Sequence, residues 1–231
     1  LEHISFRVER GQTLAIIGAT GSGKTTLASL IPRFYDATAG TVLVDGLDVR
    51  EYTFDALYNK LGYVTQKAVL FSGTVEDNVF FGQSAAEKTD ASLQAALSLS
   101  QAAEFVDKYP EKAAHPIAQL GRNVSGGQKQ RLSIARALAR KPEILIFDDS
   151  FSALDYKTDA VLREGLAKQL PGTTKIIIAQ RVASVQDADL ILVMDNGHIA
   201  DMGTHDQLLA SSEIYREVYE SQTNGGEQDE A

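Results

Sequence analysis

The sequence predicts an α/β fold, and three observations support this prediction. An apolar run at residues 13–17, typical of a strand, leads directly into a glycine-rich loop at residues 18–25 and then into a helix at residues 26–34. A second apolar run, residues 144–147, has the unbroken pattern of a strand buried in a parallel sheet. Helical and strand patterns then alternate, which favours a sheet with helices packed against it. We expect a helix at residues 157–169 and strands at residues 175–179 and 189–194.

The remaining segments suggest a core, an insert and a tail. Residues 1–8 alternate apolar and polar side chains and are expected to form a strand, as are residues 41–44 and 62–65. Residues 74–140 show mainly helical periodicity, and we interpret them as an α-helical insert. The expected parts are a core of residues 1–73 and 141–223, the insert at 74–140, and a disordered, acidic, glycine-rich tail at 224–231.

The composition argues against several classes of function. The formal net charge of -9 over 231 residues argues against general affinity for nucleic acid, which requires a basic face. The absence of cysteine removes disulfides, thiolate metal sites and thiol nucleophiles. The apolar runs have the length of strands, and the first residues lack the apolar segment of a signal peptide. If the protein works at a membrane, another stretch of polypeptide must provide the span.

The glycine-rich loop predicts a nucleotide site. Gly18, Gly23, Lys24 and Thr25 fit the pattern G-x-x-x-x-G-K-[ST], and a strand and a helix flank it as the pattern requires. The glycines let backbone N–H groups face phosphate oxygens, Lys24 reaches the outer phosphates, and the Thr25 hydroxyl binds Mg²⁺. A flexible turn is the alternative, which the flanking elements disfavour. Other loop residues expected to contact ATP are Thr20, Gly21, Ser22 and Thr26.

Two aspartates at the end of the apolar run 144–147 form the second candidate element. A carboxylate at the end of a buried strand can hold Mg²⁺, and we assign this role to Asp148. The next residue, Asp149, would face the γ-phosphate and polarise the attacking water. The alternative is a helix cap or turn, since Asp-Asp-Ser often begins a loop. The glycine-rich loop upstream favours the magnesium interpretation.

The segment Val-Ser-Gly-Gly-Gln at residues 124–128 resembles the Leu-Ser-Gly-Gly-Gln signature of ABC ATPases. The resemblance covers almost the whole chain. It implies a P-loop NTPase, RecA-like core sheet with an inserted α-helical subdomain and an N-terminal antiparallel β part that is truncated here. In that family the signature contacts ATP bound to the opposite subunit, so two such domains close head-to-tail over two ATP molecules. The matching signature residues are Ser125, Gly126, Gly127 and Gln128.

Three further segments resemble ABC ATPases. Gln66 matches the Q-loop glutamine, which contacts Mg²⁺, and Asp155 matches the D-loop at the dimer interface. Residues 70–74 with Asn78 resemble exporters in particular, in which this segment meets the coupling helices of the transmembrane domain. The resemblance therefore implies an ATP-binding domain of an ABC exporter at the cytoplasmic face of a membrane, where it powers transport.

This sequence departs from the family pattern at positions that bear on catalysis. Asp149 stands where the family usually has a catalytic glutamate, Gln180 where it has a switch histidine, and Gln119 where exporters tend to have a glutamate. The adenine-stacking aromatic residue is expected upstream of Leu1, so the chain is interpreted as truncated. With Lys24, residues 149 and 180 are the candidate catalytic residues. We expect the chain to bind ATP and hydrolyse it slowly, as in the degenerate half of a heterodimeric exporter.

Three alternatives remain at this point. The chain is a homodimeric exporter domain in which Asp149 and Gln180 suffice, a soluble ABC ATPase acting on DNA or the ribosome, or a module that uses ATP only as a dimerisation switch. The acidic charge and the exporter-like residues 70–74 disfavour the second.

Overall fold

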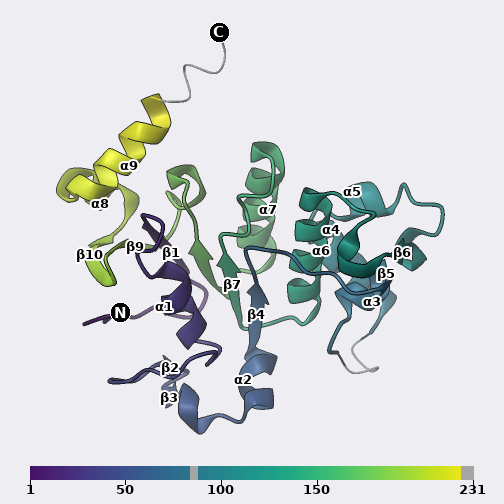
Figure 1. Ribbon diagram of the computed structural model, residues 1–231, viewed down its shortest axis with the longest axis horizontal. Helices are drawn as coiled ribbons and strands as arrows, with labels where there is room; N and C mark the ends of the chain where they lie inside the picture. The colour runs from purple at the N-terminus through teal and green to yellow at the C-terminus, as the bar shows by residue number, and fades with distance from the viewer. Residues whose placement is uncertain (84–87, 225–231) are drawn as a thin grey trace. The chain divides into compact units, whose positions relative to one another are not determined.

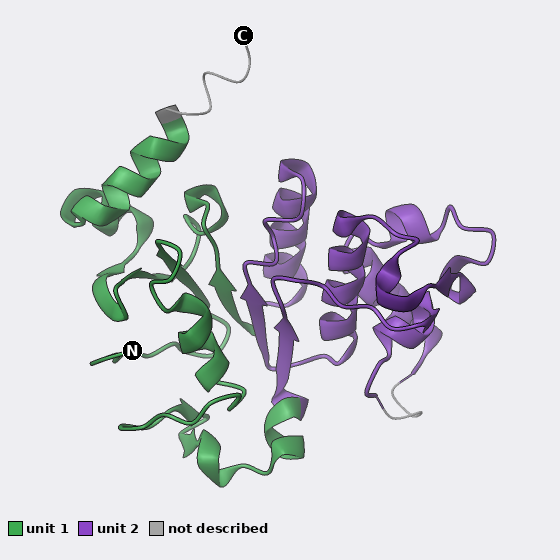
Figure 2. Ribbon diagram, viewed as in Figure 1, with its two compact units in different colours: residues 1–58, 174–231 green, residues 59–173 purple. Residues whose placement is uncertain are grey.

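The computed structural model describes residues 1–83 and 88–224. The chain forms two compact units (Figure 2). Unit 1 comprises Leu1–Tyr58 and Thr174–Ala231, and unit 2 comprises Asn59–Thr173. The described residues before Asn59 and from Thr174 onward therefore belong to unit 1, and the middle of the sequence forms unit 2.

In unit 1, described strands pair in the order β10-β9-β1-β8 (Figure 1). Their bounds are β1 Thr13–Gly18, β8 Thr174–Ile178, β9 Leu190–Asp195 and β10 His198–Gly203. β1 is parallel to both neighbours, with Leu14 opposite Ile176 on one side and Leu190 on the other, and β10 is antiparallel to β9. Residues 14–16 of β1 are 0% exposed. Burial on both faces explains the unbroken apolar run that predicted this strand.

Helices and a short ribbon complete the described part of unit 1. The helices are α1 Lys24–Leu30, α8 His205–Ser211 and α9 Glu213–Asn224, with 3-10 turns at Val49–Glu51 and Val182–Ser184. The ribbon pairs β2 Leu43–Val44 with β3 Leu47–Asp48. Along the chain, α2 Phe54–Lys60 runs from unit 1 into unit 2.

The predicted strand at residues 1–8 is wrong, since that segment contains no strand. Glu2 N–H donates to the Gly197 carbonyl oxygen at 3.0 Å, and a single bond does not make a ladder. Alternating apolar residues form a strand only where a neighbouring strand supplies regular hydrogen-bond partners. In the described N-terminal part, antiparallel pairing is found in the ribbon of β2 and β3 instead.

Unit 2 contains a parallel strand pair and a group of helices. β4 Leu61–Val64 pairs with β7 Ile144–Asp148, with Leu61 opposite Ile144 and Val64 opposite Phe147. The helices are α3 Val75–Val79, α4 Asp90–Leu99, α5 Ala103–Val106, α6 Gly126–Ala139 and α7 Tyr156–Gln169, with 3-10 turns at Lys112–Ala114 and Gln119–Gly121. α6 packs against α3, α4 and β4, and its Leu132 and Ile134 are wholly buried.

The predicted helical insert, residues 74–140, includes α3 to α6 and also a short antiparallel pair. This pair joins β5 Gly73–Thr74 to β6 Pro116–Ile117, and two residues per strand are too few for a period of two to appear in the sequence. The boundaries of the core and the insert stay a prediction. Asn224 ends α9, and the rest of the predicted tail, residues 225–231, lies outside the described residues. Across residues 1–83 and 88–224, no helix is long and apolar enough to cross a bilayer.

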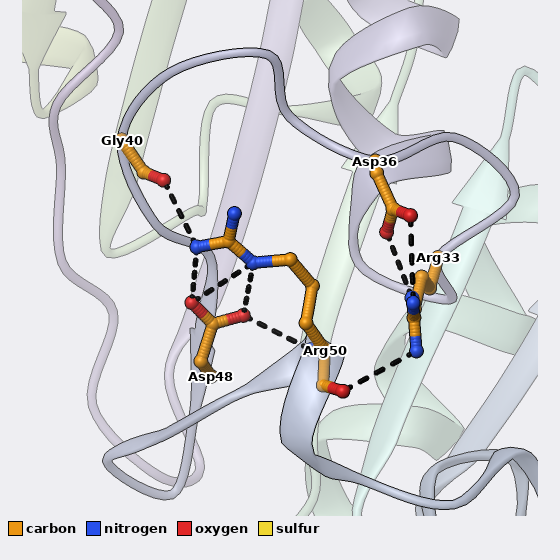
Figure 3. Close-up of polar contacts among 5 residues, drawn as sticks. All are labelled: Arg33, Asp36, Gly40, Asp48 and Arg50. Atoms are coloured by element: carbon orange, nitrogen blue, oxygen red, sulfur yellow. Dashed lines mark hydrogen bonds and ion pairs between the residues drawn. The ribbon is translucent and has the colours of Figure 1, made fainter.

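Two ion pairs fasten the segment between α1 and α2 in unit 1 (Figure 3). Arg50 Nη2 lies 2.6 Å from Asp48 Oδ2 and donates to the Gly40 carbonyl oxygen at 3.2 Å. Arg33 Nε lies 2.7 Å from Asp36 Oδ1, and Arg33 Nη1 donates to the Arg50 carbonyl oxygen at 3.4 Å. Hydrogen bonds from the side chain and then the backbone N–H of Arg50 hold the pKa of Asp48 at about 2.

Replacing Asp48 with asparagine is expected to lower the free energy of unfolding at neutral pH, and the difference should vanish in strong acid. The folded-state pKa of about 2 lies below the ordinary value of 3.8, so the ion pair contributes fully above that ordinary value. The contribution is lost as the pH falls through the folded pKa. A carbon-13 NMR titration of the Asp48 carboxyl, with urea unfolding of both proteins at several pH values, checks this. A carboxyl midpoint at the ordinary value would contradict the prediction.

Candidate nucleotide site

The glycine-rich loop connects β1 to α1 within unit 1. Gly18 ends β1 with φ of 152°, and a Cβ at this position would collide with the Met194 carbonyl oxygen of β9. Gly23 precedes α1 with φ of 101°, in the left-handed region, and its carbonyl oxygen accepts from Leu27 N–H at 2.9 Å. Neither position suits a side chain. The backbone itself can therefore form the surface that meets a phosphate group.

Lys24 is folded back over the loop and is only 8% exposed. Its Nζ donates to the carbonyl oxygens of Gly18 at 2.8 Å and Ala19 at 2.7 Å, and to Ser22 Oγ at 3.4 Å. A hollow at the surface is lined by Gly21, Gly23, Lys24, Thr25 and Thr26. A fixed positive charge beside backbone donors at the start of a helix is an arrangement that binds anions such as phosphate.

Among the other predicted loop residues, exposure differs. Thr20, Gly21, Thr25 and Thr26 are exposed, so their polar groups are accessible to a ligand. Ser22 is 4% exposed, and its carbonyl oxygen accepts from Gly197 N–H at 3.1 Å. Because Thr25 is exposed, the residue is accessible from solvent, which a metal ligand requires.

Gln180 lies at the same edge of the unit 1 sheet as the loop. β8 and β1 are parallel, Ile178 is opposite Ile16, and Ala179 N–H donates to the Ile16 carbonyl oxygen at 3.2 Å. Continuing this register along both chains brings the exposed Gln180 level with Gly18. The loop and Gln180 thus follow the carboxyl ends of adjacent strands, where ligands bind in open α/β sheets.

The acidic pair lies in unit 2, at the carboxyl end of β7. Asp148 is 5% and Asp149 8% exposed. Gln66, which follows the adjacent strand β4, donates from Nε2 to Asp149 Oδ2 at 2.8 Å. Asp149 has φ of 46°, a left-handed conformation that aspartate tolerates better than most residues. The structure therefore brings Gln66 and the acidic pair together, although they are far apart in the sequence.

Two buried or half-buried polar side chains of unit 2 belong with the acidic pair and were not predicted as site residues. The Tyr63 hydroxyl donates to Asp148 Oδ2 at 3.1 Å. Gln130, 1% exposed, donates from Nε2 to the Thr65 carbonyl oxygen at 3.2 Å and so holds the chain just before Gln66. Tyr63 lies in a strand that the sequence predicts. Its contact with Asp148 depends on the pairing of β4 with β7, which the sequence pattern does not specify.

The signature segment begins α6. Ser125 is the N-cap, and its Oγ accepts from Gln128 N–H at 3.3 Å while Gln128 Oε1 accepts from Ser125 N–H at 2.9 Å. The capping box helps to start the helix, and this role alone is enough to explain Ser125 and Gln128 of the signature. A Cβ on Gly126 would meet no atom within 4 Å, and one on Gly127 would lie 3.5 Å from the Ala153 carbonyl oxygen. The start of this helix is thus open on the side of Gly126, where its dipole favours an anion.

Asp155 caps the next helix of unit 2, α7. Its Oδ1 accepts from Thr158 N–H at 2.8 Å and its Oδ2 from Thr158 Oγ1 at 2.7 Å. These bonds, the backbone one first, lower the pKa of Asp155. Helix capping accounts for an aspartate at this position, and contact with nucleotide or with a second subunit stays a prediction.

Beside the exporter-like residues 70–74 lies a half-buried arginine of α6, which contacts Phe71 of that segment. Arg136 donates to the carbonyl oxygens of Asn78 at 2.8 Å and Val69 at 3.0 Å, and its guanidinium lies over the rings of Phe71 and Phe81. Burial lowers the pKa of Arg136 to about 10. The two phenylalanine rings stack 4.3 Å apart and stay 43% and 50% exposed. Unit 2 therefore presents a stacked aromatic pair at its surface.

The chain is similar to a known protein family and to several of its members. Residues 1–152 match the family described as ABC transporter. The chain belongs to the ABC transporter family. An uncharacterized ABC transporter ATP-binding protein of Mycobacterium tuberculosis is 46% identical over 224 residues, which is 96% of this chain and 38% of the relative. A Bacillus subtilis protein is provisionally named as a multidrug export ATP-binding/permease protein. It is 40% identical over 222 residues, which is 95% of this chain and 37% of the relative.

A solved structure is similar as well. A bacterial Atm1-family ABC exporter with ATP bound has a TM-score of 0.88 and 37% identity, over 92% of this chain and 37% of that one. The predicted α/β fold of a P-loop ATPase is confirmed, and the chain is the ATP-binding domain of an exporter-type ABC transporter. It spans less than two fifths of the length of these relatives.

Proposed function

We propose that this ABC domain binds Mg-ATP at the loop of residues 18–25, closes head-to-tail with a second ATP-binding domain, and powers export from the cytoplasmic face of a membrane. We further propose that its own site hydrolyses ATP slowly while its signature serves the site of its partner. The observation that carries the proposal is the identity and placement of Asp149, a short carboxylate held by Gln66 Nε2 at 2.8 Å.

The residues of the loop bind and orient the triphosphate in this proposal. Gly18 and Gly23 adopt the positive φ values that give the loop its path, and Lys24 Nζ supplies a positive charge. Mg²⁺ would be held by Thr25, Gln66 and Asp148, a set of hydroxyl, amide and carboxylate oxygens that suits this ion. When bound, it neutralises charge that develops on the phosphates. Residues 20–22 and 26 complete the contacts of the loop.

Slow hydrolysis follows from two side chains. The carboxylate of Asp149 is one methylene shorter than that of glutamate, and a misplacement of about 1 Å can cost about 10²-fold in rate. Gln180 can donate a hydrogen bond to a phosphate oxygen but cannot carry the positive charge of a protonated histidine. Both changes act on the same bound nucleotide, so the site retains ATP more than it hydrolyses it.

The signature, Ser125 to Gln128, is proposed to act on the nucleotide of the second domain. The open start of α6 beside Gly126 supports an anion contact there. This arrangement predicts a heterodimer whose partner carries glutamate and histidine at the positions of Asp149 and Gln180. The exposed pair Phe71 and Phe81 is the surface we propose for the coupling helices of the transmembrane part.

A complementation experiment tests this division of labour. One variant carries Asp149→Glu, Gln180→His and Ser125→Ala, which gives it a restored site and a damaged signature. The second carries only Lys24→Ala, which gives it a damaged loop and an intact signature. Each is expected to be inactive alone, and the mixture should hydrolyse ATP because the signature of one serves the site of the other.

Two controls make the result decisive. The variant with Asp149→Glu and Gln180→His alone should be active, which shows that the restored site works. Adding Ser125→Ala to the Lys24→Ala variant should abolish the activity of the mixture. Loss of this N-cap costs about 1 kcal/mol of stability, so thermal unfolding checks that the helix stays folded. A mixture no more active than its separate components, when the restored variant is active, would contradict the proposal.

A further inference from the structure

The last turn of α9 holds the backbone beside Gln180. Gln222 Nε2 donates to the Gln180 carbonyl oxygen at 2.7 Å, and Gln222 Oε1 accepts from Val182 N–H at 2.8 Å. One side-chain amide thus binds a carbonyl and an N–H two residues apart, as a neighbouring strand would. The amide orientation is fixed by this pattern, because the reverse orientation would oppose two donors and two acceptors.

The segment that Gln222 holds connects the end of β8 to a 3-10 turn. β8 ends at Ile178, and Val182 begins the 3-10 turn Val182–Ser184. The N-cap of this turn, Arg181, makes no side-chain cap bond, and Val182 is 1% exposed. A buried N–H at the start of a helical turn needs a partner from elsewhere. Gln222 provides it and thereby fixes the path of the chain around Gln180.

Gln222 is aimed at this segment by the way α9 is anchored. Tyr215 and Gln222 are two helical turns apart and lie on the same face of α9. Tyr215 is 0% exposed, its hydroxyl lies 2.8 Å from His205 Nδ1, and its N–H donates to Ser212 Oγ at 3.3 Å. α9 packs on α8 and on the turn that begins at Val182. The start of the helix is therefore fixed, and its end reaches the Gln180 segment.

We propose that Gln222 is a positioning residue that holds Gln180 in place to contact the terminal phosphate of bound ATP. The inference rests on the proposed function, because it requires that Gln180 meets that phosphate. The register that brings Gln180 level with Gly18 gives the segment its place beside the loop. Gln222 acts through the backbone of Gln180 and does not touch the nucleotide.

The test compares ATP and ADP binding to the full 231-residue chain with Mg²⁺. Gln222→Ala is expected to weaken ATP binding by about 3- to 10-fold, the usual effect of one lost hydrogen bond, and to leave ADP binding unchanged because ADP lacks the terminal phosphate. Glu220→Ala, on the same exposed stretch of α9, is the matched control and should behave as the parent. Combined with Gln180→Ala, the Gln222→Ala change should add nothing further.

A second measurement follows the hydrogen bond directly without nucleotide. Amide hydrogen exchange over residues 180–184 should be faster in Gln222→Ala than in the parent or in Glu220→Ala. Unchanged exchange would overturn the inference. So would an ATP affinity that falls in Gln180→Ala but not in Gln222→Ala, an outcome that leaves the proposed function standing. If Gln180→Ala has no effect on ATP binding, or the parent binds no nucleotide, the proposed role of Gln180 fails and the inference fails with it.

Discussion

Replacing Lys24 with alanine is expected to lower the affinity for ATP by about 10- to 100-fold and to remove measurable hydrolysis. A hydrogen bond to a charged group contributes about 1.5–3 kcal/mol, and 1.4 kcal/mol is tenfold in affinity. Nζ also bonds the carbonyl oxygens of Gly18 at 2.8 Å and Ala19 at 2.7 Å, so its removal loosens the loop itself. Isothermal titration of the chain with Mg-ATP measures the change.

The matched control for this charge is Lys60. Its Nζ forms an ion pair with Glu143 at 2.7 Å in unit 2, and neither residue is a predicted site residue. Lys60→Ala removes the same formal charge and should retain the parent affinity for ATP, because Lys60 is not a predicted site residue. Its partly exposed ion pair contributes little to the stability of the fold. Parent-like ATP binding by Lys24→Ala would show that the loop does not hold the phosphates.

Restoring the family residues, Asp149→Glu with Gln180→His, is expected to raise ATP turnover by about 10²-fold or more. The longer side chain of glutamate places the carboxylate close enough to polarise the attacking water, which alone accounts for about a 10²-fold gain in rate. Histidine adds a group that can offset developing negative charge. Each single change should give a smaller gain, because the two side chains act on the same reaction step. Steady-state phosphate release from the parent, both single variants and the double variant measures these effects.

The backbone conformation of Asp149 determines which control variants this experiment needs. Its φ of 46° is left-handed, and residues other than glycine, asparagine and aspartate pay about 1–2 kcal/mol there. Asp149→Glu should therefore lower the thermal stability slightly while raising turnover. Asp149→Asn keeps the shape and the tolerance for this conformation but removes the charge, so it should gain no activity. Equal turnover in the parent and the restored double variant would contradict the proposed cause of slow hydrolysis.

The sequence predicted best those parts of the fold that leave a pattern in consecutive residues, such as an apolar run or a short motif. The apolar runs that became β1 and β7 are buried strands, and the helix after the glycine-rich loop is α1, although it begins earlier, at Lys24, and ends at Leu30. These patterns depend on neighbours in the sequence. The alternation at residues 1–8 looked equally regular, and it failed because a strand also needs a partner strand.

The contacts between site residues that are far apart in the sequence could not be predicted from local sequence patterns. The bond from Gln66 to Asp149 spans 83 positions, and the bond from Gln222 to Gln180 spans 42. Each depends on which strands and helices become neighbours, and periodicity does not specify that. Asp155 illustrates the reverse case, because its bonds to Thr158 are local and capping accounts for it without any ligand.

Slow hydrolysis at this site is tested most directly by the fate of bound ATP. The chain is incubated with labelled Mg-ATP, and both the bound nucleotide and the steady-state release of phosphate are measured, in the parent and in Asp149→Ala. The expected result is that bound nucleotide remains largely ATP in both proteins and that Asp149→Ala changes an already low turnover little. Rapid turnover by the parent that Asp149→Ala abolishes would contradict a slow site and favour a competent homodimeric exporter domain.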